Sequence, residues 1–131
     1  MSIDAYRRRK EAAETPRELE RRALTTVIGK LAQGKQQGGT ALIEACYLNN
    51  KLWTALLVDL SLPENALPDD LKARLISIGI WVQRYTPRAM GGAAPVDPLI
   101  AVNRSIAEGL GTTPAGMGAG SGAAIAELGI V

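Results

Sequence analysis

The sequence predicts an all-α protein, a compact bundle of about five helices with a flexible Gly-rich C-terminal tail. Apolar residues recur at steps of three and four along most of the chain, and no long stretch alternates polar and apolar residues as a strand would. Residues that start or stop helices, mainly Thr, Pro, Asp and Gly, stand at the ends of these patterns. With 131 residues, 47% of them hydrophobic and 21% charged, the chain can bury one substantial core.

The first two predicted helices lie on either side of Thr15. A short helix is expected over about residues 3–13. Thr15 is a favourable N-cap for the second helix, Pro16 suits its first position, and Glu18 completes a capping box. The apolar stripe of this helix consists of Leu24, Val27, Ile28 and Leu31. The residues expected to end it are Gly34, Gly38 and Gly39.

The third helix is expected at about residues 40–60, and a turn over 61–67 joins it to the fourth. The apolar stripe of the third helix consists of Leu42, Ala45, Cys46, Leu52, Trp53, Leu56 and Leu60. Cys46 lies inside this stripe, which indicates a small core residue rather than a reactive thiol. The fourth helix opens at Pro68, and the two acidic residues that follow suit the positive end of a helix dipole.

The fourth helix has apolar residues on more than one side, which predicts a central position in the bundle. One side carries Leu71, Leu75, Ile78, Val82 and Tyr85, and the other sides carry Ile76, Ile80 and Trp81. Gly79 costs a helix about 1 kcal/mol relative to Ala, which indicates that another backbone approaches closely there. Pro87 and the Gly91-Gly92 pair are expected to end this helix.

The fifth helix is expected to begin at Asp97. Its inward-facing residues are expected to be Leu99, Val102, Ile106 and Leu110. Residues 1–110 are therefore predicted to form one helical domain, and residues 111–131 a flexible Gly-rich tail. The apolar end of this tail, residues 123–131, is long enough for a turn or two of helix. The tail is either native or an addition introduced for expression.

The composition argues against an enzyme. The chain has no His and a single Cys, which excludes Ser-His-Asp and Cys-His catalytic units, an internal disulfide, and zinc sites built from His or several Cys. The order of the acidic residues does not suggest a carboxylate metal site, so we expect no catalytic residue, metal or cofactor. No apolar run approaches the roughly 18 residues of a membrane span, and the N-terminus does not resemble a secretory signal. We therefore expect a cytoplasmic protein.

Two Asn residues interrupt the apolar stripes. Asn49 lies in the middle of the third helix's stripe, and Asn103 is equally central on the fifth helix. A buried amide without partners costs about 1–3 kcal/mol, so each is expected to have hydrogen-bond partners. The two interpretations are a structural role, with bonds that fix the register of the helices, and a binding role, with amides presented to a partner helix. The structural role is favoured.

The large aromatic residues have two interpretations as well. Trp53, Trp81 and Tyr85 lie on the two most apolar helices of a chain that has no Phe. Core packing is the expected role of either Trp taken singly. Of the two, Trp81 is the better candidate for lining a groove that accepts an amphipathic partner helix.

Four short motifs stand in order between about residues 4 and 110. They are the run from Thr15 to Glu20 (TPRELE), Asn49 with Leu52-Trp53-Thr54, Leu67-Pro68, and the run from Asn103 to Leu110 (NRSIAEGL). Together these motifs resemble the FlaF family of bacterial proteins of flagellar biosynthesis. Cys46 stands where the family usually has Leu, a conservative change in volume. The Gly-rich tail lies outside the resemblance.

The resemblance implies a small cytoplasmic helical protein, a secretion chaperone for flagellin and a positive regulator of its production that acts opposite the translational repressor FlbT. Flagellin ends are amphipathic helices that polymerise, so a chaperone must cover their apolar side until export. We expect the bound helix to lie in a groove between the third and fourth helices, with the fifth alongside. The expected apolar contacts are Leu56, Leu57, Trp81 and Tyr85, with Arg84 and Arg104 at the rim.

The alternative function is a post-transcriptional regulator that acts on flagellin mRNA or on FlbT. It depends on a basic cluster, Arg7 to Lys10, within residues 1–35, which carry nine basic and five acidic residues. Such a cluster can bind phosphates, but interleaved Glu residues favour a solvated helix face, and no RNA-binding motif accompanies it. Direct RNA binding is therefore not expected. A third possibility, a structural subunit of the flagellum, is the least favoured.

Overall fold

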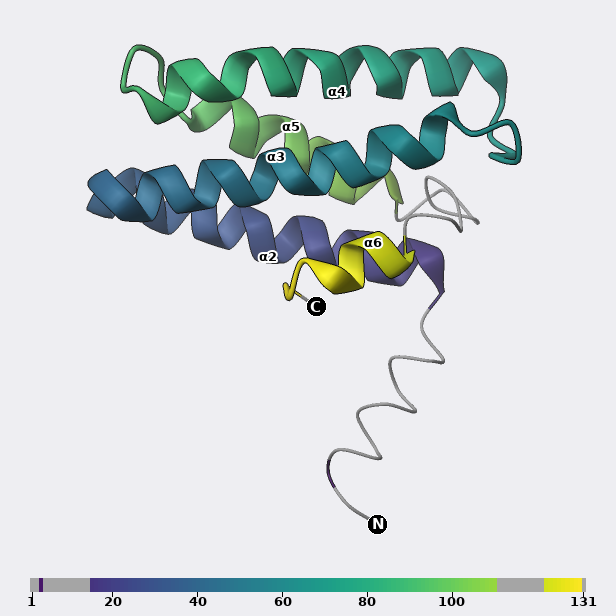
Figure 1. Ribbon diagram of the computed structural model, residues 1–131, viewed down its shortest axis with the longest axis horizontal. Coiled ribbons are helices and arrows are strands. Elements are labelled where there is room, and N and C mark those ends of the chain that lie inside the picture. The colour runs from purple at the N-terminus through teal and green to yellow at the C-terminus, as the bar shows by residue number, and fades with distance from the viewer. Residues whose placement is uncertain (1–2, 4–14, 111–121, 131) are drawn as a thin grey trace.

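In the computed structural model the described residues are 3, 15–110 and 122–130, and every regular element among them is a helix. The helices are α2 (Pro16–Gln37), α3 (Gly39–Ser61), α4 (Asp69–Met90), α5 (Asp97–Leu110) and α6 (Gly122–Glu127), as Figure 1 shows. The predicted all-α bundle is thereby confirmed. Apart from Ile3, the helix expected over 3–13 lies outside the described residues, as do residues 111–121 of the predicted tail.

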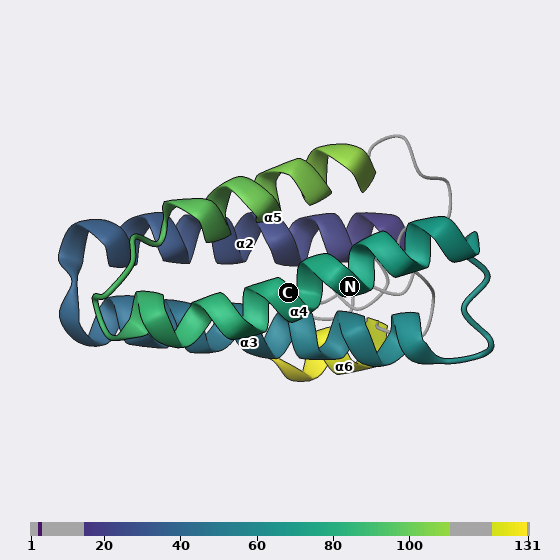
Figure 2. The ribbon, with the colours of Figure 1, turned by 90° about the horizontal axis from the view of Figure 1, so that it is seen from above.

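The central helix of the bundle is α3. It packs against α2, α4 and α6, while α5 packs against α2. Figure 2 shows α5 on one face of the α2–α3 hairpin and α6 on the other. The prediction that the fourth helix is central is wrong, because Ile80 and Trp81 on its outer sides are 41% and 38% exposed. Apolar residues on several sides of a helix do not reveal whether another helix covers each side.

Both ends of α2 have capping residues. Thr15 is the N-cap, as predicted, and its Oγ1 accepts a hydrogen bond of 3.1 Å from the backbone N–H three residues later. Gly38 and Gly39 have φ values of 65° and 53°, which glycine adopts without strain, so the chain turns there directly into α3. Gly34 does not end the helix, contrary to the prediction. A Cβ on Gly34 would lie 2.8 Å from the Cα of Leu42, so this glycine lets α2 and α3 approach closely.

Two predictions for α4 are also wrong. The helix continues through Pro87 to Met90, because a proline in the last turn has little helix beyond it to disturb. It ends where the Gly91-Gly92 pair follows, as predicted, with Gly92 at a φ of 76°. The close neighbour of Gly79 is a side chain rather than a backbone. A Cβ on Gly79 would lie 2.5 Å from Cδ2 of Leu57 on α3. Leu57 therefore fits against the surface of α4 where no side chain projects.

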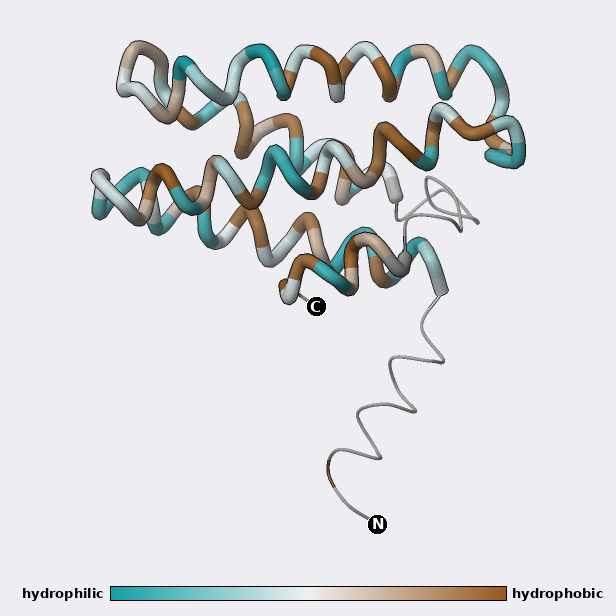
Figure 3. Tube along the Cα trace, viewed as in Figure 1, coloured by the Kyte–Doolittle hydropathy of each residue, from teal (hydrophilic) through white to brown (hydrophobic). Residues whose placement is uncertain are grey.

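The core is built from branched apolar residues around one aromatic side chain, that of Trp53. Bands of apolar residues recur along each long helix in Figure 3. The large apolar side chains less than 2% exposed are Leu24, Val27, Leu31, Leu52, Trp53, Leu56, Leu60, Val82, Leu99 and Ile125. Cys46 is also fully buried, and burial raises the pKa of its thiol, so Cys46 is a small core residue as the sequence indicates.

The buried side of α5 differs from the predicted stripe. Among the side chains that the structure describes, it includes Leu99, as predicted, and also Ile100, Asn103 and Ala107, whereas Val102 and Ile106 are only half-buried. The side chain of Leu110 lies outside this description. At the start of α5, Asp97 pairs with Lys35 of α2 at 2.5 Å, and this hydrogen bond lowers the pKa of Asp97. Because both side chains are more than half exposed, the pair adds little stability. Because a different side of α5 from the predicted one faces the core, Val102 lies toward α4.

The apolar end of the predicted tail is a docked helix. α6 packs against α2 and α3, with Ile125 fully buried and Leu128 and Ile130 packed against the core. The prediction that this end forms a turn or two of helix is confirmed. The helix α6 docks on the α2–α3 hairpin and not between α4 and its neighbours.

Candidate functional site

An apolar groove lies between α4 and α5. It has a volume of about 290 Å³ and is lined by Ser77, Ile78 and Trp81 of α4 and by Val102 of α5. These side chains lie on neighbouring turns, because positions 77, 78 and 81 follow the helical spacing. Trp81 is 38% exposed, so a bulky apolar surface faces solvent at this groove. Such a surface is typical of a site that binds a partner.

Trp81 is held in place by its neighbour on the next turn. The rings of Trp81 and Tyr85 stack with their centroids 4.9 Å apart and an angle of 25° between their planes. The hydroxyl of Tyr85 donates a 2.6 Å hydrogen bond to the carbonyl of Pro95, in the segment between α4 and α5. The guanidinium of Arg88 lies 5.8 Å from the centre of the Tyr85 ring. These contacts restrict the indole before any partner arrives.

A buried polar network joins α3 to α5. Asn103 donates from Nδ2 to Oδ1 of Asn49 at 2.6 Å, and its own Oδ1 accepts from Nε1 of Trp53 at 2.8 Å. All three side chains are fully buried. Both amides bond inside the protein, so in this conformation neither Asn faces a surface where a partner can bind.

One comparison with known proteins identifies the family. The family model of flagellar protein FlaF matches residues 2–110. The chain belongs to the FlaF family. This confirms the resemblance inferred from the four motifs and makes it a flagellar protein. The groove and the Asn network both lie inside the matched range, whereas α6 lies beyond it. No curated protein and no solved structure matches the chain.

In this FlaF-family chain, two of the residues expected at the partner groove are not free to line one. Leu56 is 1% exposed and belongs to the core, so a partner cannot reach it. Leu57 packs against Gly79 and helps to close the seam between α3 and α4. The open groove lies one helix further on, between α4 and α5, and it includes Trp81 of the predicted set.

The remaining predicted residues flank this groove. Tyr85 supports Trp81 rather than lining the cavity. Arg84 and Arg104 are both exposed, one on each of the two helices that form the groove. Arg84 follows Trp81 by three positions, and Arg104 follows Val102 by two. Val102 is a groove residue that the sequence analysis assigned to the core, because a heptad-like pattern does not distinguish a core side from a groove side.

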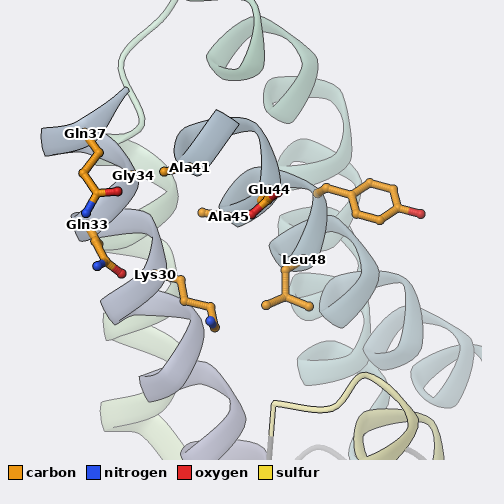
Figure 4. Close-up of a pocket in the computed structure, with 9 residues that line it drawn as sticks. Lys30, Gln33, Gly34, Gln37, Ala41, Glu44, Ala45 and Leu48 are labelled. Atoms are coloured by element: carbon orange, nitrogen blue, oxygen red, sulfur yellow. The ribbon is translucent and has the colours of Figure 1, made fainter. Parts of the chain in front are cut away.

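A second hollow on the FlaF-family chain was missed altogether. It lies between α2 and α3, close to their glycine turn, and has a volume of about 430 Å³ (Figure 4). It is lined by Lys30, Gln33, Gly34, Gln37, Ala41, Glu44, Ala45, Tyr47 and Leu48. The signal in the sequence is the pair of small residues Ala41 and Ala45, whose short side chains leave space beside the close contact of the two helices at Gly34.

Two features are absent from the part of this FlaF-family chain that the structure describes. Within 3, 15–110 and 122–130, no three Cys, Asp or Glu side chains come together in a way that could hold a metal ion. Over the same residues, no helix combines the length and the apolar character needed to cross a membrane.

Proposed function

We propose that this FlaF-family chain is a flagellin-binding export chaperone that holds an amphipathic end helix of flagellin in the α4–α5 groove. The observation that supports it is the groove itself, where Ile78, Trp81 and Val102 form an apolar surface between two helices. Amphipathic helices bind such grooves through side chains spaced by three and four positions. This role requires no catalytic group, metal or cofactor.

Trp81 is the proposed anchor of the complex. Buried aromatic side chains at the centre of an interface contribute more binding energy than most of the residues around them. Its stacking on Tyr85, which Pro95 holds through a hydrogen bond, reduces the conformational freedom that binding must remove. Covering of Trp81 by a bound helix also explains why an apolar indole is exposed on α4 in the chain alone.

Arg84 and Arg104 are proposed to act at the rim. Both guanidinium groups are exposed on the groove helices, where they are able to pair with acidic residues on the polar side of a bound helix. Rim charges of this kind affect the rate of association and its salt dependence more than the final affinity.

The proposal also accounts for the expected positive effect on flagellin production and for the expected cytoplasmic location of the protein. A chaperone that keeps newly made flagellin ready for export acts in the cytoplasm and promotes flagellin production without contacting RNA. The alternative, action on flagellin mRNA or on FlbT, depends on Arg7 to Lys10, which lie outside the described residues.

The test is calorimetric titration of flagellin into the unaltered chain and into a Trp81→Ala variant. We expect micromolar or tighter binding for the unaltered chain and at least about tenfold weaker binding for Trp81→Ala, because the anchor side chain is lost. Val58→Ala is the matched control, since Val58 is a 59% exposed apolar residue on α3 outside the groove. Absence of flagellin binding at micromolar concentrations contradicts the chaperone function, and equal affinities for the two variants contradict the groove.

A further inference from the structure

The α2–α3 hairpin has a face that is only partly covered. α6 packs against both helices over one part of this face. In Figure 1, α6 runs toward the turn between α2 and α3, and the 430 Å³ hollow flanks that turn. Figure 4 shows the hollow opening between Lys30 and Leu48, with the chain that follows α6 at its lower edge. The hollow therefore continues the surface on which α6 lies.

α6 occupies its place with few contacts. It has six residues, too few for a helix that is stable alone in water, so its helical form depends on docking. Ile125 is the one fully buried side chain described in this segment, and Leu128 and Ile130 are half-buried beside it. The segment also lies outside the FlaF family match, which ends at residue 110.

The hollow beyond α6 has the properties of a helix-binding surface. Its floor contains the small side chains of Ala41 and Ala45, which leave room for the side chains of another helix, whereas Gly34 beside them is already packed against the backbone of α3. Leu48 adds an apolar side chain on the wall nearest α6. Lys30 and Glu44 provide one charge of each sign at the sides, suited to the mixed polar side of an amphipathic helix.

We propose that α6 is a displaceable occupant of a second helix-binding groove, and that the other amphipathic end helix of flagellin replaces it. This inference rests on the proposed chaperone function. A helix longer than α6 covers the α6 site and the adjoining hollow together, whereas α6 fills only the first. Because α6 stays tethered through residues 111–121, it competes as an intramolecular ligand and lowers the apparent affinity for flagellin. The α4–α5 groove and the α2–α3 groove then receive one flagellin helix each.

The first test compares two full-length variants of α6. Ile125→Asp places a charge where the helix docks, and we expect flagellin to bind this variant about tenfold more tightly, because the competing segment is released. Ala126→Asp adds the same charge to the exposed side of α6 and is expected to bind within about twofold of the unaltered chain. Ile125→Ala, a milder truncation, is expected to shift the affinity in the same direction and serves if Ile125→Asp does not fold. Unchanged or weaker flagellin binding by a folded Ile125 variant overturns the proposal.

The second test does not involve flagellin. A synthetic peptide of residues 122–131 is titrated by calorimetry into the same proteins at up to about 1 mM, the effective concentration that a short tether provides. We expect it to bind the Ile125→Asp chain and not the unaltered chain, whose groove is occupied. If the peptide binds neither protein, α6 is not a displaceable ligand and the inference fails. If the peptide binds as expected but flagellin binds no variant, the groove remains and the chaperone function is what fails.

Discussion

Asn103 uses both ends of its amide inside the core. The oxygen accepts from the indole of Trp53 and the nitrogen donates to the oxygen of Asn49, so one side chain satisfies groups on two others. The Nδ2 of Asn49, by contrast, is buried without a hydrogen-bond partner. The two asparagines are therefore unequal, although they occupy similar positions in their apolar stripes.

This asymmetry predicts different costs for the same substitution. Asn103→Leu leaves the Trp53 N–H and the Asn49 oxygen without partners, and we expect a loss of about 2–5 kcal/mol in the free energy of unfolding. Asn49→Leu leaves only one Asn103 donor unpaired and also removes the unpaired Nδ2, so a smaller loss of about 1–2 kcal/mol is expected. Urea denaturation followed by circular dichroism measures both values. An equal cost for the two variants contradicts the predicted asymmetry.

At the scale of the element, glycines within one helix have opposite roles. In α2, a Cβ at Gly34 would meet the backbone of α3 at 2.8 Å, whereas a Cβ at Gly29 would meet nothing within 4 Å. A backbone neighbour cannot move aside as the end of a side chain can. Gly34 is thus required by the approach of α3, and Gly29 is not.

These two sites form a matched pair for substitution by Ala. Gly29→Ala is expected to stabilise the protein by about 0.5–1 kcal/mol, because Ala favours a helix over Gly and nothing obstructs it. Gly34→Ala is expected to destabilise it by about 1–3 kcal/mol, because the gain in helix propensity is smaller than the cost of separating two packed helices. Thermal unfolding of both variants checks the sign of each change. A stabilising Gly34→Ala contradicts the close approach of α2 and α3.

The limits of the helices were largely predictable from the sequence, but which helices pack against one another was not. Capping and spacing placed the start of α2 at Thr15 and the limits of α3 within one or two residues. The same signals misjudged Gly34 and Pro87, because either residue can stand inside a helix when a partner helix or the nearby helix end accommodates it. Periodicity identifies an apolar side of a helix, but it does not say whether that side meets the core, a groove or solvent.

For the whole molecule, the candidate site was predicted only in part, because periodicity does not say what an apolar side of a helix contacts. The expected core packing is confirmed for Trp53 and wrong for Trp81, which is 38% exposed. Only the ranking of Trp81 as the better groove candidate was predictable, because α4 has more apolar sides than one core contact needs. Leu56, expected at the groove, lies in the core, and Val102, expected in the core, lines the groove, because the spacing of apolar residues does not fix how a helix is rotated about its axis. The docking of α6 depends on tertiary packing that no local pattern encodes, and the small residues at the α2–α3 hollow do not by themselves show that the two helices lie side by side there.

The placement of the two tryptophans gives the protein two separate optical reporters. Trp53 is fully buried and hydrogen-bonded to Asn103, whereas Trp81 faces solvent at the α4–α5 groove. The fluorescence of Trp53 should therefore report unfolding, and that of Trp81 should report occupation of the groove. With a Trp81→Phe variant we expect the red shift on denaturation to persist and the change in emission on adding a flagellin without Trp to disappear. Persistence of that second signal would locate the binding event elsewhere on the surface.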